Sequence, residues 1–156
     1  MYHFYLEISF LKKIEADATG DRKSDDRMLD RHLLFVVQRK RHDGKMIWTL
    51  PNTQWKEGET LRQTAERVLK DHVATDPVRI LGNAPWGVHL VKYPSSVRQK
   101  TGVFGTKIFF YKAQLLNGRQ CTPSTADYHW LGRQELSDFL EPDYYNTVKQ
   151  FLIDED

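Results

Sequence analysis

Short apolar runs and one amphipathic helical stretch follow one another along the chain. The run Leu33–Val37 is continuously apolar, which is typical of a strand buried on both faces. Asp43-Gly44 then gives a hairpin turn signal, and apolar positions resume directly after it. The pattern predicts strands over Tyr2–Leu11, Leu33–Val37, Met46–Leu50, Val78–Leu81, Trp86–Val91, Thr106–Leu115 and Tyr128–Leu131.

The clearest predicted helix begins at Thr60 and continues to His72. The Thr60 hydroxyl can accept a hydrogen bond from the Gln63 amide while the Gln63 side chain reaches back, which is a capping box. Asp76-Pro77 then stops the helix, because proline disfavours helical backbone in the residue before it. One face carries Leu61, Thr64, Ala65, Val68, Leu69 and His72 at helical spacing.

The remaining segments complete a mixed architecture. Two further helices are predicted over Arg133–Leu140 and Asp143–Ile153. The segments Asp17–Asp30 and Pro94–Gly105 are predicted loops, and another loop runs from Pro51 to Gly58. Strands and helices thus interleave without internal repeats. This favours one α/β (α+β) domain over residues 1–156, a mixed β-sheet packed between helices, with 17–30 as a flexible loop.

Composition narrows the class of protein. A chain of 156 residues with 40 % apolar and 28 % charged residues is usual for one globular domain. The longest apolar runs are too short to span a bilayer, and no secretory or transit signal is visible at Met1. The net charge of +2 gives no strong electrostatic footprint, so an acidic partner such as RNA would have to meet local basic patches.

Isolated reactive side chains give little support for catalysis. The single cysteine, Cys121, excludes an internal disulfide and a multi-cysteine zinc site. The serines at 95, 96 and 124 have no evident base. The histidines show no ligand spacing on a predicted helix; those outside the main helix are His3, His32, His42, His89 and His129. We therefore expect no metal and no cofactor.

The most informative motif spans residues 53–74. It resembles the phosphate-handling motif of the Nudix hydrolases, which reads Gly, five residues, Glu, seven residues, Arg-Glu-aliphatic-x-Glu-Glu-x-Gly. In that register Glu59 and Arg67 keep the residues of the motif, whereas the first and last glycines are Thr53 and Ala74. Where the motif has its three helical glutamates, this chain has Val68, Asp71 and His72.

These substitutions remove most of the groups that would hold magnesium. Carboxylates four residues apart lie on one helix face and reach one ion, whereas valine cannot ligate and neutral histidine is a poor magnesium ligand. We therefore expect no catalytic residue, and we interpret Glu59, Arg67 and Asp71 as vestigial. Gly58 permits the turn into the helix, and Glu59 and Arg67 can form an ion pair, with Asp71 as an alternative partner of Arg67.

Two interpretations stay open for the exposed-looking residues. The cations Arg39, Lys40, Arg41, Arg98 and Lys100 could contact RNA phosphates, or they could be solvated loop charges. Trp55 in the loop before Gly58 fits either a protein interface or burial against the helix.

Beyond the motif, the chain resembles the mitochondrial large-subunit ribosomal protein 46 family, a Nudix-fold group with a degenerate Nudix box. The resemblance is carried by 29–34, 48–51, 58–62, 64–67, 81–85, 105–113, 129–130, 135–142 and 148–149. Leu81–Pro85 is the most specific stretch, because Nudix chemistry does not call for it.

The resemblance implies a structural role in mitochondrial translation. It implies a mitochondrial location, and a place in the central protuberance of the large ribosomal subunit, beside other large-subunit proteins and structural RNA. It implies no enzyme activity, no cofactor and no membrane partner. The alternatives are a residual hydrolase of a nucleoside diphosphate derivative that uses Glu59 and Asp71, or a domain that binds such a nucleotide without cleaving it.

Overall fold

The computed structural model describes residues 2–7, 20–24, 32–41, 43–72, 78–115 and 127–152. The strands are β1 (Tyr2–Glu7), β2 (Leu33–Lys40), β3 (Met46–Thr49), β4 (Asn52–Thr53), β5 (Val78–Ile80), β6 (Gly87–Lys92), β7 (Gly105–Leu115) and β8 (Tyr128–Gly132). The helices are α2 (Leu61–His72), α3 (Ser95–Thr101), α4 (Leu136–Phe139) and α5 (Pro142–Val148). Within these residues, none of the helices is long and apolar enough to cross a membrane.

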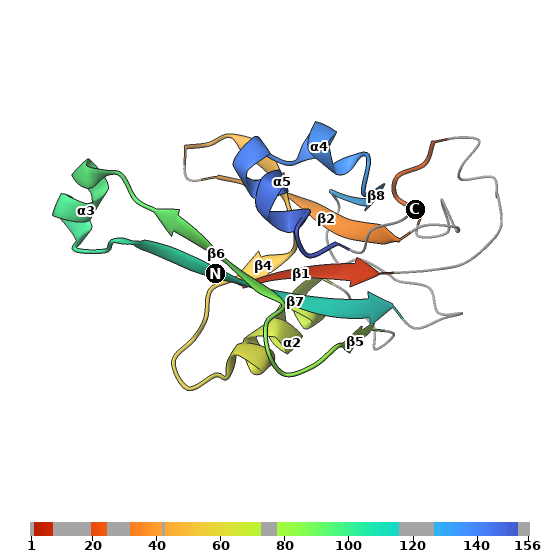
Figure 1. Ribbon diagram of the computed structural model, residues 1–156, viewed down its shortest axis with the longest axis horizontal. Coiled ribbons are helices and arrows are strands. Elements are labelled where there is room, and N and C mark those ends of the chain that lie inside the picture. Colours follow the sequence, from red (N-terminus) through yellow and green to blue (C-terminus); the bar gives the residue numbers. More distant parts are fainter. Residues whose placement is uncertain are drawn as a thin grey trace.

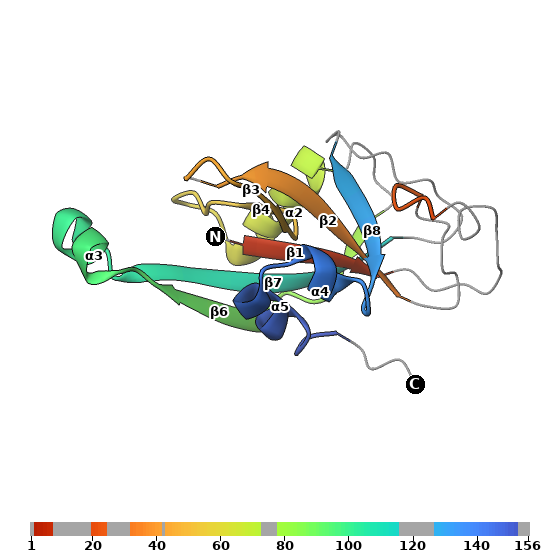
Figure 2. The same ribbon diagram turned by 90° about the horizontal axis from the view of Figure 1, so that it is seen from above.

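The strands form two sheets that lie between helices (Figures 1 and 2). The larger sheet has the order β4-β1-β7-β5, with β6 also paired to β7, and the smaller has the order β3-β2-β8. Strand β1 runs parallel to β7, and the other pairs are antiparallel. Figure 1 shows α2 on one side of the strands and α4 and α5 on the other. This is the expected α+β arrangement.

Strand β2 supplies side chains to both halves of the core. Leu33, Phe35 and Val37 belong to the cluster that includes Ala65 and Val68 of α2. The alternate residues Leu34 and Val36 belong to the second cluster, with residues of α4 and α5. Successive side chains of a strand point to opposite faces, so a strand between two apolar layers must be apolar throughout. The prediction of a strand buried on both faces is confirmed.

Helix α2 begins where the capping box predicts. The Thr60 amide donates to Gln63 Oε1 at 2.8 Å, and the Gln63 amide donates to Thr60 Oγ1 at 3.1 Å. Thr64, Ala65 and Val68 are buried, while Leu61 and Leu69 pack against the same cluster. The preceding turn has Gly58 at φ 88°, a backbone conformation that side chains disfavour.

The predicted loop over Pro94–Gly105 is wrong, because this segment contains α3. Val97 and Arg98 donate backbone hydrogen bonds to the Pro94 carbonyl, both at 3.0 Å. Gly102, in the left-handed region at φ 68°, ends the helix by donating to the Arg98 carbonyl. No residue of α3 is buried. A short helix without an apolar stripe gives no periodic signal, so only its backbone hydrogen bonds reveal it.

Several boundaries also differ from the predictions. The loop after Pro51 contains β4, a two-residue strand that pairs with β1. The helix predicted from Arg133 begins only at Leu136, because the Glu135 amide donates to the Gly132 carbonyl in a turn before it. Helix α5 ends at Val148 and not at Ile153. The end of the first predicted strand, most of Asp17–Asp30, the Asp76-Pro77 stop, Cys121 and Ile153 lie outside the described residues.

One part of the fold extends away from the rest. Strand β6 and the beginning of β7 form a two-stranded ribbon, and α3 connects them at its end. In both views α3 lies at the far end of this ribbon, well separated from α2, α4 and α5 (Figures 1 and 2).

Candidate functional site

The turn before α2 is joined to the helix by a bidentate ion pair. Arg67 Nε donates to Glu59 Oε1 at 2.8 Å, and Arg67 Nη2 donates to Glu59 Oε2 at 2.9 Å. The second carboxylate oxygen also accepts from the Thr64 hydroxyl at 2.8 Å and from the Lys56 amide at 3.3 Å. Both Glu59 oxygens are therefore engaged inside the motif, and the predicted Glu59–Arg67 pair is present.

Arg67 also holds the segment at the start of the motif. Its Nη1 donates to the Thr53 hydroxyl at 3.0 Å, and its Nη2 donates to the Gln54 carbonyl at 2.7 Å. Thr53 stands where the Nudix motif has its first glycine, and its side chain supplies an acceptor that glycine lacks. One guanidinium thus joins β4, the turn and α2, which uses the fixed fork of five donors that arginine provides.

Glu59 should give the fold a stability that is lost in acid. Hydrogen bonds from Arg67 are the main cause that lowers the pKa of Glu59 from 4.5 to about 2. A lowered folded-state pKa stabilises the fold above pH 4.5, and this contribution disappears as the pH falls from there to about 2. Glu59→Gln should therefore lower the melting temperature at pH 7, and its difference from wild type should shrink over that pH range.

Unfolding curves for both proteins at several pH values measure this. The matched control is Glu66→Gln, which removes a more exposed carboxylate that pairs with Arg62 on the same helix. Its effect should be much smaller, because exposed ion pairs contribute little to stability. Parallel stability profiles of wild type and Glu59→Gln between pH 7 and pH 2 would contradict the prediction.

The residues of α2 do not fit a magnesium site. Val68, at the first helical carboxylate position of the motif, is fully buried in the core and has no donor atom. At the position four residues later, burial lowers the pKa of His72 and so favours the neutral imidazole. The described residues contain no group of three or more histidine, cysteine, aspartate or glutamate side chains able to hold a metal ion. Magnesium prefers several oxygen ligands, and this helix face offers only Asp71.

Trp55 is both exposed and anchored. The residue is 46 % exposed, while its Nε1 donates to the Glu59 carbonyl at 2.7 Å. Of the two sequence interpretations, burial against the helix is therefore wrong, because a hydrogen bond to the turn holds the indole near the surface.

The candidate RNA-contacting cations do not lie together. Arg41 forms ion pairs with Asp43 and Glu141, and its hydrogen bond to Asp43 is the main cause that raises its pKa. Arg39 donates to Asn52 Oδ1 at 3.0 Å. Lys40 is exposed at the end of β2. The other two, Arg98 and Lys100, lie in the last turn of α3, at the tip of the ribbon.

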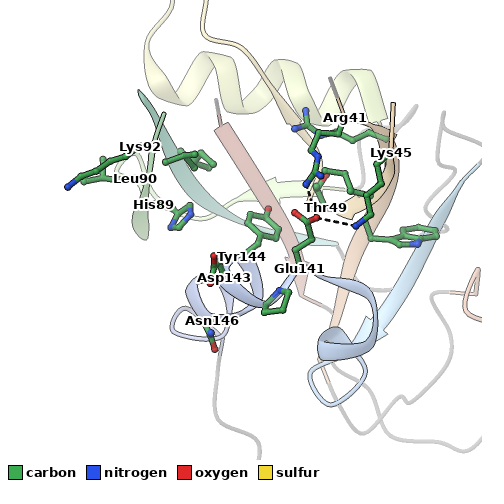
Figure 3. A pocket seen from close by; sticks show the side chains of 16 residues that line it. Arg41, Lys45, Thr49, His89, Leu90, Lys92, Glu141, Asp143, Tyr144 and Asn146 are labelled. Atoms are coloured by element: carbon green, nitrogen blue, oxygen red, sulfur yellow. Dashed lines mark hydrogen bonds and ion pairs between the residues drawn. The ribbon is translucent and has the colours of Figure 1, made fainter. Parts of the chain in front are cut away.

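A groove with a volume of ≈ 1090 Å³ separates β3 from β6 and the start of α5 (Figure 3). Arg41 Nη1 and Lys45 Nζ converge on Glu141 Oε1 at 2.8 and 3.8 Å on one side of it. Leu90 and Lys92 of β6 point away from that cluster (Figure 3). Arg41 and Lys45 already share a carboxylate partner, which disfavours a phosphate beside them.

The structure adds contacts that the sequence did not indicate. Arg62 Nη1 donates to the Gly82 carbonyl at 2.6 Å and to Asn83 Oδ1 at 2.9 Å. Tyr111 donates its hydroxyl to the Asn83 carbonyl at 3.3 Å. These bonds tie Leu81–Pro85 to α2 and β7. A structural connection between distant segments accounts for this specific stretch, and no local pattern could have revealed it.

Comparison with known proteins supports the sequence resemblance. No protein-family model matches the chain. It is 43 % identical over 142 residues to Large ribosomal subunit protein mL46 of Bos taurus, covering 90 % of this chain and 50 % of that protein. The Mus musculus protein of the same name is 40 % identical over 147 residues, covering 93 % and 51 %. The chain spans about half the length of the curated relatives it matches.

Comparison of folds identifies the architecture. A Nudix hydrolase from M. smegmatis, RenU, has a TM-score of 0.58 at 13 % identity, covering 99 % of this chain and 88 % of that chain. The E. coli dihydroneopterin triphosphate pyrophosphohydrolase has a TM-score of 0.58 at 18 % identity, covering 96 % and 93 %. Such low identities show the fold alone. The chain is therefore, over most of its length, a sequence relative of the large ribosomal subunit proteins mL46, and it is built on the Nudix fold.

Proposed function

We propose that this chain is a structural constituent of the central protuberance of the mitochondrial large ribosomal subunit, and that its Nudix fold is catalytically inactive. The observation that carries the ribosomal role is the 43 % identity to a large-subunit protein over nine tenths of the chain. In this role the domain contacts neighbouring large-subunit proteins and structural RNA during mitochondrial translation.

The geometry of the motif supports inactivity. Magnesium-dependent hydrolysis of a nucleoside diphosphate derivative needs carboxylates that present oxygens to the metal, whereas both oxygens of Glu59 accept hydrogen bonds from Arg67 and other groups of the motif. Val68 adds apolar surface to the core where a ligand would be needed. Glu59, Arg67 and Val68 thus stabilise the loop and the helix, and a residual hydrolase using Glu59 and Asp71 is the less favoured function.

Sedimentation of mitochondrial ribosomes tests the ribosomal role. The tagged chain, directed to mitochondria, should migrate with the large subunit at about one copy per particle. Crosslinks within purified subunits should join it to proteins of the central protuberance. A chain found only in the free fractions would contradict the proposal.

A second measurement tests inactivity on the purified chain. With magnesium and a panel of nucleoside diphosphate derivatives, we expect no turnover above that of Glu59→Gln, and no heat of specific nucleotide binding by calorimetry. Magnesium-dependent turnover that Glu59→Gln abolishes would establish the hydrolase instead. Specific heat without turnover would establish a nucleotide-binding domain.

A further inference from the structure

The extended ribbon combines exposed apolar side chains with positive charge. We call it the basic arm, and it comprises residues 87–108, which include β6, α3 and the beginning of β7. Among the described residues, six of the nine large apolar side chains that are exposed lie between Val88 and Phe104. Leu90 is 59 % exposed and Phe104 is 77 % exposed. Such a concentration on one projecting segment is typical of an interaction surface.

The charges of this part of the chain have a single sign. The sequence contains no aspartate or glutamate between Asp76 and Asp127. The arm carries Lys92, Arg98, Lys100 and Lys107. The chain as a whole is nearly neutral, at +2, so its acidic residues are concentrated elsewhere. The arm therefore favours a partner surface with negative charge.

The register of the ribbon shows that the side chain of Leu90 faces away from α5. His89 of β6 pairs with Ile108 of β7, so the two side chains share one face of the ribbon. This face meets α5, because His89 Nδ1 lies 2.9 Å from the Thr147 hydroxyl oxygen. Ile108 on the same face is part of the core. Leu90 pairs with Lys107. Directly opposite residues of an antiparallel pair share a face, so Leu90 and Lys107 lie together on the face opposite to His89.

The arm is also open along its edges. Among the described strands, β6 pairs only with β7, and β1 meets β7 only from Phe109 onward. Beyond that point the ribbon has two strands, and such a ribbon is only marginally stable in water without further packing. A partner that covers its apolar face would stabilise it.

We propose that the basic arm docks on another protein of the large subunit, at a surface where apolar residues are flanked by carboxylates. This inference rests on the ribosomal role proposed above. Protein is favoured over RNA because the exposed side chains of the arm are mostly aliphatic. Valine and leucine gain from burial against other apolar groups, whereas RNA bases are bound by stacking on aromatic rings and by hydrogen bonds, and phosphates by cations and hydrogen-bond donors.

A competition experiment in mitochondria tests the inference. A variant and the wild-type chain, each with its own tag, are produced together, and their ratio in purified large subunits is compared with their ratio in the extract. Leu90→Lys combined with Phe104→Lys should lower incorporation about tenfold or more, because central apolar contacts dominate protein interfaces. The control is Met46→Lys, which changes an exposed apolar residue outside the arm, and it should stay within about twofold of wild type.

The lysine substitutions distinguish protein from RNA. Added cations strengthen contacts with phosphates, so undiminished or increased incorporation of the arm variant would overturn the proposal in favour of RNA. Lys92→Glu combined with Lys100→Glu should also lower incorporation, and no effect of this charge reversal would exclude an acidic partner.

Unfolding curves of the purified variants should match wild type, since all the changed side chains are exposed. A variant that is unfolded is replaced by Leu90→Ser combined with Phe104→Ser.

Photo-crosslinking gives an independent measurement. A photo-reactive amino acid in place of Phe104 should join the chain to a protein, in a product that protease destroys and ribonuclease leaves intact. A ribonuclease-sensitive product, or wild-type incorporation without any crosslink from position 104, would overturn the docking of the arm alone. Absence of the wild-type chain from large subunits would instead overturn the ribosomal role, and the inference with it.

Discussion

Replacing Val68 with glutamate should destabilise the fold by about 3–5 kcal/mol, even though it returns a carboxylate to the motif. The side chain at this position is fully buried among Phe35, Ala65, Tyr111 and their neighbours. A glutamate there would lose its hydration without gaining a partner charge. The position that holds a catalytic ligand in the Nudix motif is thus a packing position in this protein.

The loss should depend on pH with a defined sign. Burial raises the folded-state pKa of such a glutamate above its unfolded value of about 4.3. The folded state then binds the proton more tightly, so the destabilisation is smallest below pH 4 and grows as the pH rises. Urea unfolding at several pH values measures this. Val68→Gln, which has the same shape without the charge, should be destabilised without that pH dependence; identical profiles for the two variants would contradict the explanation.

The same position offers a test of lost catalysis. Val68→Glu combined with His72→Glu should show no magnesium-dependent hydrolysis of nucleoside diphosphate derivatives. The substrate contacts would also have to be present, and both Glu59 oxygens remain engaged by the motif. Measurable hydrolysis by a folded double variant would show that the remaining pocket is intact.

Trp130→Ala should cost about 3–5 kcal/mol of unfolding free energy, by creating a large cavity in the core. Trp130 is 1 % exposed, and its ring centroid lies 4.9 Å from that of Phe35. It joins β8 to β2 within the cluster that also holds α2. Chemical denaturation of the purified variant measures the loss as a lower midpoint at an unchanged slope.

Trp55→Ala is the matched control for this cavity. Trp55 is nearly half exposed, and the substitution removes one hydrogen bond to the Glu59 carbonyl from a surface turn. We expect a cost below about 1 kcal/mol. Similar losses for the two tryptophans would contradict the assignment of Trp130 to the core.

The sequence by itself determined the features whose physical cause is local. The capping box at Thr60 and Gln63 satisfies the first amides of α2 through residues three apart, so its pattern is readable without a fold. The continuous apolar run of β2 and the helical stripe of α2 record burial directly as side-chain type. Val68 and His72 stand at two glutamate positions of the motif. Because the ability to bind magnesium depends on residue type, their identity alone predicts that the metal ligands are lost.

Only the tertiary structure decided which distant residues meet. The candidate cations look alike in the sequence, but Arg39 and Arg41 contact an amide and a carboxylate of other segments, whereas Arg98 and Lys100 lie at the tip of the arm. Helix α3 has no buried face, so its sequence has no periodic pattern of apolar residues that would predict a helix. The contacts of Arg67 with Thr53 and of Arg62 with Asn83 depend on chain segments brought together by the core. The apolar or polar type of a residue indicates whether it is buried. Its hydrogen-bond and ion-pair partners in distant segments depend on how the whole domain packs.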